Sequence, residues 1–414
     1  MNTSNVLIIA SDYKPKPGGR AEYIDQLARG LISLGNRTKV LAVVQSHRKE
    51  RLAFLEKYEE WVIPFPVVHD ERPKDWLGNK FVSLLEIVRC VSPNAQRVLE
   101  RTRFFRASAN SVARLESVLE AERPTMVVFG HLDMRLYPFA LLFLERRAPY
   151  GIIAHESEIY RFPNRKNELI RRGMMLEGAQ WIAANSRHTK SLVEMWGIPS
   201  GKIKIIHPPI AEEAIRALVD LEQNRSTRDE LNTVSICRLV QPKGIDTVIR
   251  ALKILDGRGI PCRHVIAGDG VERTLLEGLV DELGLRHRIQ FTGHIADDEK
   301  WRLLRNSDVF VMPSRVDPKM QHEGFGMAFV EAAAFGLPGV GSRAGGIPDA
   351  IVDGETGILV PQDSPESLAD ALTFLYRNPG KREDMGRAAM QRAKSQFSPT
   401  AVAARFQEEI RKNA

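Results

Sequence analysis

Two glutamates stand eight residues apart in the apolar stretch QHEGFGMAFVEAAAFG, residues 321–336. Glu323 precedes a Gly-Phe-Gly turn, and Glu331 lies inside the alanine-rich segment that follows it. An ionised carboxylate among apolar neighbours is costly to bury unless hydrogen-bond donors compensate it. Neutral sugar hydroxyls are suitable donors, whereas phosphates would be repelled by both carboxylates.

The glycine turn between the two glutamates supplies a different kind of binding group. The predicted strand SDVFVMPS (307–314) precedes the turn, and a helix is predicted to begin near Met327. Unpaired backbone amides at a helix N-terminus attract anions. The stretch therefore predicts a nucleotide-sugar site, with the diphosphate at the helix N-terminus and the hydroxyls on the glutamates.

Two cations in CRLVQPKG (237–244) could complete a diphosphate site. Arg238 and Lys243 stand at the end of a predicted strand and in the loop that leads into a helix. This is where α/β domains bind phosphates, and a guanidinium and an ammonium would stabilise charge on a leaving phosphate. On the local pattern alone, two solvated surface cations remain the alternative.

Three glycine-containing turns also follow predicted strands. Gly19 lies in a lysine- and proline-rich loop where backbone amides could approach an anion. The glycines of AGDG (267–270), which contains Gly268, and of FTGH (291–294), which ends in His294, allow close approach of a base or ribose. Taken singly, each is equally consistent with an ordinary turn. A G-x-G-x-x-G fingerprint is absent, which disfavours a dinucleotide-dependent dehydrogenase.

Apolar runs typical of buried strands alternate with helical patterns along the chain. The runs lie at 6–11, 39–44, 125–130, 151–155, 181–186, 233–239, 263–268, 288–293 and 307–314. This alternation predicts an α/β protein whose parallel sheets are covered on both faces. Sites in such sheets lie at the carboxyl ends of the strands, where His155 stands after GIIA. A structural histidine remains the alternative for His155.

The length of 414 residues favours two domains. The predicted boundary follows KIKIIHPPI (202–210), where a strand ends in Pro-Pro. It gives an N-terminal acceptor-side domain, 1–210, and a C-terminal donor-binding domain, 211–396. Residues 45–120 are the least readable part; they include a basic helical pattern at 95–106.

The net charge of +7 is unevenly distributed. Residues 1–210 carry 32 Lys and Arg against 22 Asp and Glu, a net charge of +10. This excess favours an anionic partner, either a phosphorylated acceptor or an anionic membrane surface. No nucleic-acid-binding signature is present, and an unevenly charged but inert surface remains the alternative.

Cysteine usage and hydropathy bear on the compartment. Cys90, Cys237 and Cys262 are scattered and form no C-x-x-C pair, so neither a disulfide framework nor a zinc site is expected. The N-terminal apolar run is too short for a signal peptide, and no stretch approaches the ~20 residues of a membrane span. We expect a cytoplasmic protein, with the inner face of the membrane as a further location.

The chain resembles the retaining glycosyltransferases of family 4, over nearly all of the second half and about half of the whole chain. Their GT-B fold has two Rossmann-like, doubly wound domains that face each other across a cleft. The strongest match is EGFGMAFVEAAAFGLPGVGSRAGGIPDAIVDGETGILV (323–360), which contains the E-x7-E element. The other matching segments are PGGRAEYIDQLARGL (17–31), SICRLVQPKGIDTVIRAL (235–252), VIAGDG (265–270), IQFTGHI (289–295) and VMPSR (311–315).

The resemblance implies a role for each matching residue of the donor-binding domain. Arg238 and Lys243 bind the donor diphosphate, Glu331 accepts hydrogen bonds from the ribose, and Glu323 contacts the transferred sugar. The positions of sugar and phosphate are expected to depend on the backbone amides of Phe325, Gly326 and Met327.

In the acceptor-side domain, Gly19 approaches the phosphates, and His155 lies near the reacting carbon. The resemblance implies no metal or other cofactor, and it places the last helix, 397–414, with the first domain. The chain departs from the family pattern at two places: the segment VDPKMQH (316–322) is longer than in the shortest members, and Gly339 is inserted after Leu337-Pro338.

The expected reaction is hexosyl transfer from a UDP- or GDP-sugar to a sugar, lipid-linked or small-molecule acceptor in glycoconjugate synthesis. A nucleotide-sugar epimerase of the same fold is the main alternative, and a binding-only relative is disfavoured because every expected donor contact is present. A hydrolase acid/base pair made of Glu323 and Glu331 is weaker, because nothing in the sequence sets opposed pKa values for them.

Overall fold

The computed structural model describes residues 4–15, 18–45, 48–67, 103–160, 166–216, 229–317 and 323–411. The chain forms two compact units, Met1–Ala184 with Leu192–Lys204 and Ala403–Ala414, and Asn185–Ser191 with Ile205–Val402. The chain passes into the second unit at residue 205 and returns to the first unit at residue 403. Cys90 and residues 95–102 of the predicted basic helix lie outside the described residues.

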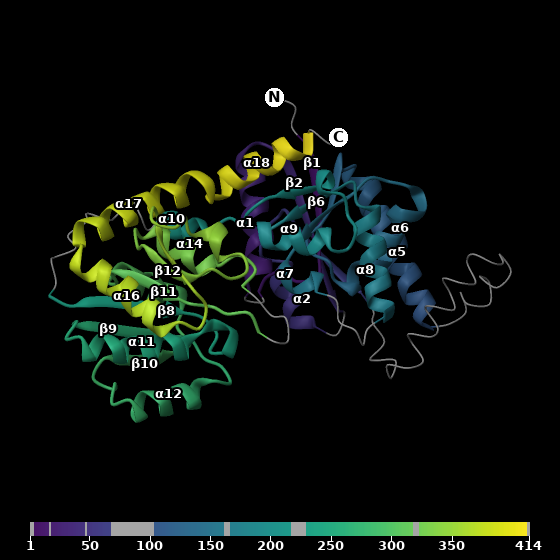
Figure 1. Cartoon of the computed structure of the whole chain (residues 1–414). Helices are drawn as coiled ribbons and strands as arrows, with labels where there is room; N and C mark the ends of the chain where they lie inside the picture. The colour runs from purple at the N-terminus through teal and green to yellow at the C-terminus, as the bar shows by residue number, and fades with distance from the viewer. Residues whose placement is uncertain are drawn as a thin grey trace. The chain divides into compact units, whose positions relative to one another are not determined.

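The first unit is built on a seven-stranded sheet of order β3-β2-β1-β4-β5-β6-β7. Figure 1 labels its strands β1, β2 and β6. Strands β1 to β6 run parallel to their neighbours, as predicted. The strands are β1 (Asn5–Ala10), β2 (Arg37–Gln45), β3 (Val62–Val67), β4 (Met126–Phe129), β5 (Gly151–Ala154), β6 (Trp181–Ala184) and β7 (Ile203–Ile205). Strand β3 escaped prediction because Pro64 and Pro66 interrupt its pattern; an edge strand tolerates proline.

Helices cover both faces of this sheet. They are α1 (Gly19–Ser33), α2 (Lys49–Leu55), α5 (Arg103–Glu122), α6 (Tyr137–Arg146), α7 (Glu156–Ile159), α8 (Lys166–Gly178), α9 (Arg187–Glu194) and α18 (Pro399–Arg411), with short 3-10 turns η1 (Met134–Leu136) and η2 (Ser200–Lys202). Leu7 and Ile9 of β1 pack in one core cluster with Phe139 of α6. On the opposite face, the Ile24 side chain of α1 and the Ala10 side chain of β1 both lie next to Gly130. Alternate residues of one strand thus face two helical layers.

The second unit has a six-stranded parallel sheet of order β10-β9-β8-β11-β12-β13. Its strands are β8 (Leu231–Ile236), β9 (Cys262–Ala267), β10 (Ile289–Gly293), β11 (Val309–Met312), β12 (Gly339–Ser342) and β13 (Gly357–Val360). Its helices are α10 (Glu212–Arg216), η3 (Gln241–Lys243), α11 (Ile245–Gly257), α12 (Arg273–Glu282), α13 (Asp297–Arg305), α14 (Met327–Ala334), α15 (Ile347–Ala350), α16 (Pro365–Arg377) and α17 (Pro379–Gln396).

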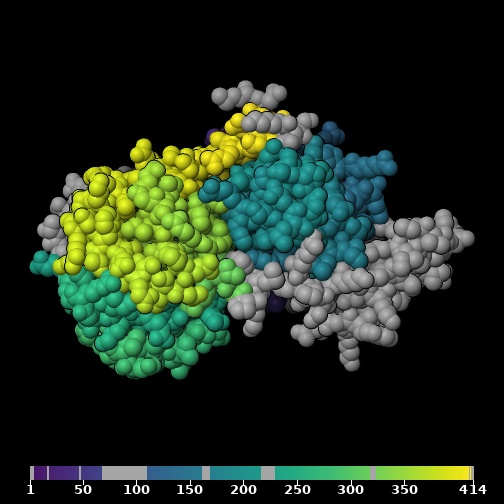
Figure 2. Space-filling model, in the orientation of Figure 1, coloured from purple at the N-terminus to yellow at the C-terminus, as the bar shows by residue number. Residues whose placement is uncertain are grey.

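Strand β11 shows how this sheet is covered on both faces. Val309 and Val311 belong to a core cluster with residues of α11, α12 and α16, whereas Phe310 and Met312 belong to a second cluster with α14 and α17. Because α16 packs against α11, the yellow surface of α16 and α17 adjoins the teal-to-green surface of residues 229–300 (Figure 2). The α14 helix begins at Met327, where the sequence predicts a helix start.

Strands β12 and β13 were not predicted. Each has four residues, and Gly339 and Gly341 leave β12 with little strand propensity of its own. Parallel pairing with β11 stabilises β12 despite its low strand propensity. None of the helices described is both long and apolar enough to cross a lipid bilayer.

Candidate functional site

The second unit changes its winding direction between β8 and β11, which are neighbours in its sheet. Ligands in doubly wound sheets bind outside the carboxyl ends of the strands at such a switch point. The loop after β8 carries Arg238 and Lys243, and the chain after β11 leads to Glu323 and the glycine turn. The tertiary structure therefore gathers the two sequence segments predicted to bind one ligand.

Lys243 and Glu323 are directly paired at this point, through the Lys243 Nζ and Glu323 Oε2 atoms. Their side chains are only 21% and 15% exposed. Burial by itself would lower the pKa of the Lys243 ammonium, but the Glu323 carboxylate outweighs this effect and holds the pKa above its usual value. Lys243 is therefore held as an ammonium, and each partner keeps hydrogen-bonding capacity for a further group.

Arg238 is close enough for its charge to oppose that rise in the pKa of Lys243. Its side chain is exposed, and within the described part of the chain its guanidinium makes no hydrogen bond or ion pair. Two cations thus stand at the end of β8, one fixed by a carboxylate and one available to solvent. This arrangement suits a bound diphosphate.

The turn after Glu323 is shaped by its backbone. Gly326 has a φ of 98° and forms the N-cap of α14, in a backbone conformation that residues other than glycine rarely adopt. The amide of Gly346 donates to the Glu323 carbonyl at 2.8 Å, and a Cβ on Gly346 would lie 2.1 Å from the Gly324 carbonyl oxygen. Gly345 and Gly346 therefore pack directly against the backbone of the turn, a role that the sequence did not indicate.

Phe325 and Met327 flank Gly326 but differ in environment. The Phe325 ring is buried and stacks on His207 at a centroid distance of 5.1 Å, so its side chain anchors the turn. Met327 is the first residue of α14 and is half-buried. The free amides at this helix start remain the anion-attracting groups that the sequence predicts.

Glu331 lies one turn into α14, and its Oε1 atom accepts from the Lys300 ammonium at 3.3 Å. Lys300 comes from α13, contacts Asp297 at the same distance, and lies over the Trp301 ring. No local signal in the sequence marks Lys300 as a partner of Glu331. The two glutamates thus hold two different lysines, and no contact between their carboxylates places them as an acid/base pair.

The strand ends of β9 and β10 support the loop after β8. A Cβ on Gly268, whose φ is 134°, would lie 1.9 Å from the Cys237 carbonyl oxygen. The Gly268 amide also donates to the Gly293 carbonyl at 2.7 Å. Gly268 is therefore required by close backbone packing beside Arg238. His294, directly after β10, is exposed.

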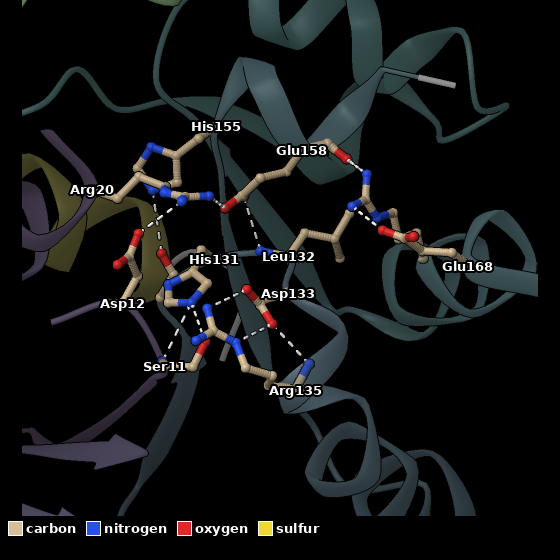
Figure 3. A network of polar contacts seen from close by, with 12 residues as sticks. Ser11, Asp12, Arg20, His131, Leu132, Asp133, Arg135, His155, Glu158 and Glu168 are labelled. Carbon is tan, nitrogen blue, oxygen red and sulfur yellow. Dashed lines mark hydrogen bonds and ion pairs between the residues drawn. The ribbon is translucent and has the colours of Figure 1, made fainter. Parts of the chain in front are cut away.

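The first unit has its own polar cluster, at the ends of β1, β4 and β5 (Figure 3). Arg20, the residue after Gly19 in α1, pairs with Asp12 and with Glu158, each at 2.7 Å. The other Glu158 oxygen accepts from the Leu132 amide at 3.0 Å. Glu158 is 4% exposed, so these donors compensate a buried carboxylate.

Two buried histidines belong to the same cluster. His155 is 6% exposed, its Nε2 lies 3.3 Å from the Gly130 carbonyl, and burial together with Arg20 lowers its pKa to about 3. Burial lowers the pKa of His131 to about 4. Both rings are therefore neutral near pH 7. His155 donates to Gly130 and is not positioned as a charged group.

Sequence reading missed most of this cluster. Asp12 lies two residues after the end of β1, and His131, Asp133 and Arg135 follow β4, whose strand lies beside β1 at the switch point of the first sheet. The rule that polar residues at neighbouring strand ends converge could have found them. Gly19 is the first residue of α1, and nothing described lies within 4 Å of the position that a Cβ would take there.

Two doubly wound units with polar clusters at their switch points define a protein of the GT-B class. Solved structures agree on the fold: an Anabaena protein, Alr3699/HepE, in complex with UDP has a TM-score of 0.71 at 19% identity, covering 99% of this chain and 100% of that chain. A glycosyltransferase from Rickettsia africae has a TM-score of 0.73 at 18% identity, covering 100% and 99%.

Two family models divide the chain between them. The model described as Glycosyltransferase Family 4 matches residues 17–214, and that of Glycosyl transferases group 1 matches residues 219–392. The chain belongs to the family 4 glycosyltransferases.

Curated relatives match this chain over different lengths. A GDP-mannose-dependent alpha-(1-6)-phosphatidylinositol monomannoside mannosyltransferase of Mycobacterium tuberculosis is 28% identical, covering 99% of this chain and 98% of its own. An alpha-D-kanosaminyltransferase of Streptomyces kanamyceticus is 32% identical over 46% of this chain and 47% of its own.

Proposed function

We propose that this glycosyltransferase moves a hexosyl group from a nucleoside-diphosphate sugar, a UDP- or GDP-sugar, to an acceptor hydroxyl with retention of anomeric configuration. The observation that carries the proposal is the Lys243–Glu323 pair at the β8/β11 switch point, beside the exposed Arg238. The two cations suit the diphosphate of a nucleotide sugar, and the carboxylate suits its sugar hydroxyls. The mycobacterial relative named as GDP-mannose-dependent supports this class of donor.

The donor's diphosphate is assigned to Arg238, Lys243 and the amides at the start of α14. The negative charge that develops on the leaving phosphate is stabilised by these groups, which are fixed in place before the reaction. We assign to Gly19, in the first unit, a backbone contact with the donor phosphates. No described atom lies within 4 Å of the position that a Cβ on Gly19 would take. Gly268 and His294 line the region assigned to the nucleoside.

The donor's hydroxyls are assigned to the two glutamates. Glu323, which is paired with Lys243, accepts from the transferred sugar, and Glu331 accepts from the ribose. The backbone of Phe325, Gly326 and Met327 positions sugar and phosphate. Positioning of this kind supplies a large part of a transfer barrier without any protein nucleophile.

Retention is assigned to a front-face reaction. The leaving phosphate oxygen takes the acceptor proton while the sugar passes through an oxocarbenium-like state. His155 is a neutral ring in this scheme and acts through its backbone or as a dipole near the reacting carbon. We place the reaction in the cytoplasm and in glycolipid or other glycoconjugate synthesis, with the basic first domain in contact with an anionic membrane, without a metal and without a nucleic-acid partner.

Nucleotide binding is the first test. A thermal-shift panel of UDP, GDP and ADP with their sugars should show stabilisation by one nucleotide series, because a ligand that binds only the folded state raises its stability. NMR of the bound donor incubated with and without candidate acceptors then identifies the reaction. Transfer only with acceptor, and with the donor's anomeric configuration, is expected. Conversion of the donor's sugar without acceptor would identify an epimerase instead.

A further inference from the structure

A cavity of about 890 Å³ lies within the first unit, at the carboxyl ends of its strands. Gln45 and Val67, the last residues of β2 and β3, line it together with residues of α2 and Arg135 after β4. This volume falls within the ~300–1,000 Å³ typical of small-molecule sites. None of its lining residues has been assigned to the donor.

The charged lining of the cavity is strongly basic. Arg48, Lys49, Arg51 and Arg135 line it, against Glu50 as the one acidic residue among its lining residues. Arg135 is already matched by Asp133, which accepts from its Nε at 2.9 Å and from its Nη2 at 2.7 Å. The other three cations form no ion pair within the described ranges. A net positive charge therefore faces the cavity.

Arg51 is the cation most affected by this environment. Its Nη2 donates to the Tyr13 carbonyl at 2.8 Å, which fixes the guanidinium, but its buried Nε has no hydrogen-bond partner among the described residues. Burial and the like charges of Arg135 and Arg48 lower its pKa, although Asp12 acts in the opposite direction. An arginine in this position gains both a hydrogen bond and charge compensation from an anion.

We propose that this cavity binds the phosphate of a phosphorylated acceptor, with Arg51 as its central donor. The inference rests on the proposed glycosyl transfer, because it names the acceptor class of that reaction. Three cations without an ion-pair partner among the described residues provide more positive charge than a ligand with a single carboxylate would balance. A phosphate monoester fits them better, because it carries about −1.5 to −2 charges at pH 7 and three acceptor oxygens. The donor's own diphosphate is assigned to residues of the other unit.

The apolar part of the lining indicates what carries the phosphate. Phe54, 40% exposed, and Val67 offer carbon surface next to the cations. A phosphate on a polyol or a sugar ring would contact both kinds of surface. A phosphate monoester occurs on soluble phosphate esters and also in phosphatidic acid, where it forms the lipid headgroup, so these two sources are separated by experiment.

Direct binding tests the site without any transfer. Binding of glycerol 3-phosphate, with glycerol as the uncharged comparison, is measured by calorimetry on the full chain. Arg51→Ala should weaken binding about tenfold or more, as expected for loss of a charge-assisted hydrogen bond. The double variant Arg48→Ala/Lys49→Ala removes two exposed side chains that folding does not need, and should weaken binding similarly.

Two further variants separate a specific site from general basicity. Glu50→Gln should tighten phosphate binding, because it removes the one acidic group in the lining. Lys57→Ala removes an exposed cation that follows α2 outside the cavity and should leave binding unchanged. Equal binding by wild type and Arg51→Ala, or no binding of glycerol 3-phosphate by the wild type, would overturn the proposal.

Vesicles identify the source of the phosphate. Phosphatidylcholine vesicles with and without phosphatidic acid are sedimented with each variant. A loss of both glycerol 3-phosphate and vesicle binding in the Arg51 variant supports a lipid headgroup, and a loss of glycerol 3-phosphate binding alone supports a soluble ester. The nucleotide-induced thermal shift is measured in parallel. If the wild type shows no thermal shift with any nucleotide, the proposed function is contradicted. If the thermal shift is present but Arg51→Ala binds glycerol 3-phosphate as well as the wild type does, only the cavity assignment is contradicted.

Discussion

The Lys243 ammonium is ion-paired with the Glu323 carboxylate, although the two residues lie 80 positions apart in the chain. They follow β8 and β11, which pair side by side where the winding of the sheet changes direction. Each side chain limits the conformations of the other, so the cation and the carboxylate are positioned before a ligand arrives. Preorganisation of this kind makes electrostatic stabilisation effective in transfer reactions.

Replacing Lys243 should abolish most of the transfer activity. Lys243→Met removes the cation assigned to the leaving phosphate and leaves Glu323 without its partner, so we expect the turnover rate to fall about 100-fold or more. Initial rates at saturating donor measure this effect. Lys253→Met, on the half-exposed side of α11, is the matched control and should retain normal rates. Near-normal turnover in both Lys243→Met and Glu323→Ala would refute the donor-site assignment.

Glu331 should contribute to nucleotide affinity through the ribose. Glu331→Gln replaces a charged acceptor with a neutral one, and we expect the Kd of the preferred nucleoside diphosphate to rise about tenfold. The 2′,3′-dideoxy form of the same nucleotide lacks both ribose hydroxyls, so the variant and the wild type should bind it equally. Glu366→Gln, exposed on α16, serves as control. A penalty of equal size for both nucleotides would mean that Glu331 acts through Lys300 instead.

Gly268 should tolerate no side chain. Gly268→Ala places a Cβ against the Cys237 carbonyl at a φ of 134°, so we expect a loss of stability of about 2 kcal/mol or more and weaker nucleotide binding. Gly278→Ala, in α12 with nothing described within 4 Å, should instead stabilise the protein by roughly 0.5–1 kcal/mol. Urea denaturation of both variants measures the contrast. A stable Gly268→Ala protein would show that the loop after β8 can move away.

The buried His155 should make the protein sensitive to mild acid. Its pKa is about 3 in the folded protein and 6.5 without burial, so only the unfolded chain takes up a proton between these values. Its contribution to stability is therefore fully present above pH 6.5 and is lost as the pH falls toward 3. Between pH 7 and pH 5 this loss is about 2 kcal/mol.

His155→Gln keeps a donor for the Gly130 carbonyl and cannot titrate. Urea denaturation at pH 7 and pH 5 should show a smaller loss of stability on acidification for the variant than for the wild type. The difference between the two pH values is the readout, because any change common to both cancels. An unchanged difference would show that the ring is already charged at pH 5 in the folded protein.

The sequence by itself determined the fold class, the E-x7-E element and most of the strands. These features are local: the runs of β1, β2 and β8 to β11 are apolar enough to be recognised, and the glycine turn before Met327 marks the start of α14. Strands β3, β12 and β13 were missed because proline or glycine weakens their own propensity, and their neighbours in the sheet compensate.

Only the tertiary structure decided which charges meet. The sequence marked Lys243, Glu323 and Glu331, but it did not show that the first two pair with each other or that Lys300 of α13 holds the third. The same holds for Arg51 and Arg135, which come from distant segments and line one cavity. Such pairs depend on strand order, because residues at the carboxyl ends of neighbouring parallel strands converge whatever their separation along the chain.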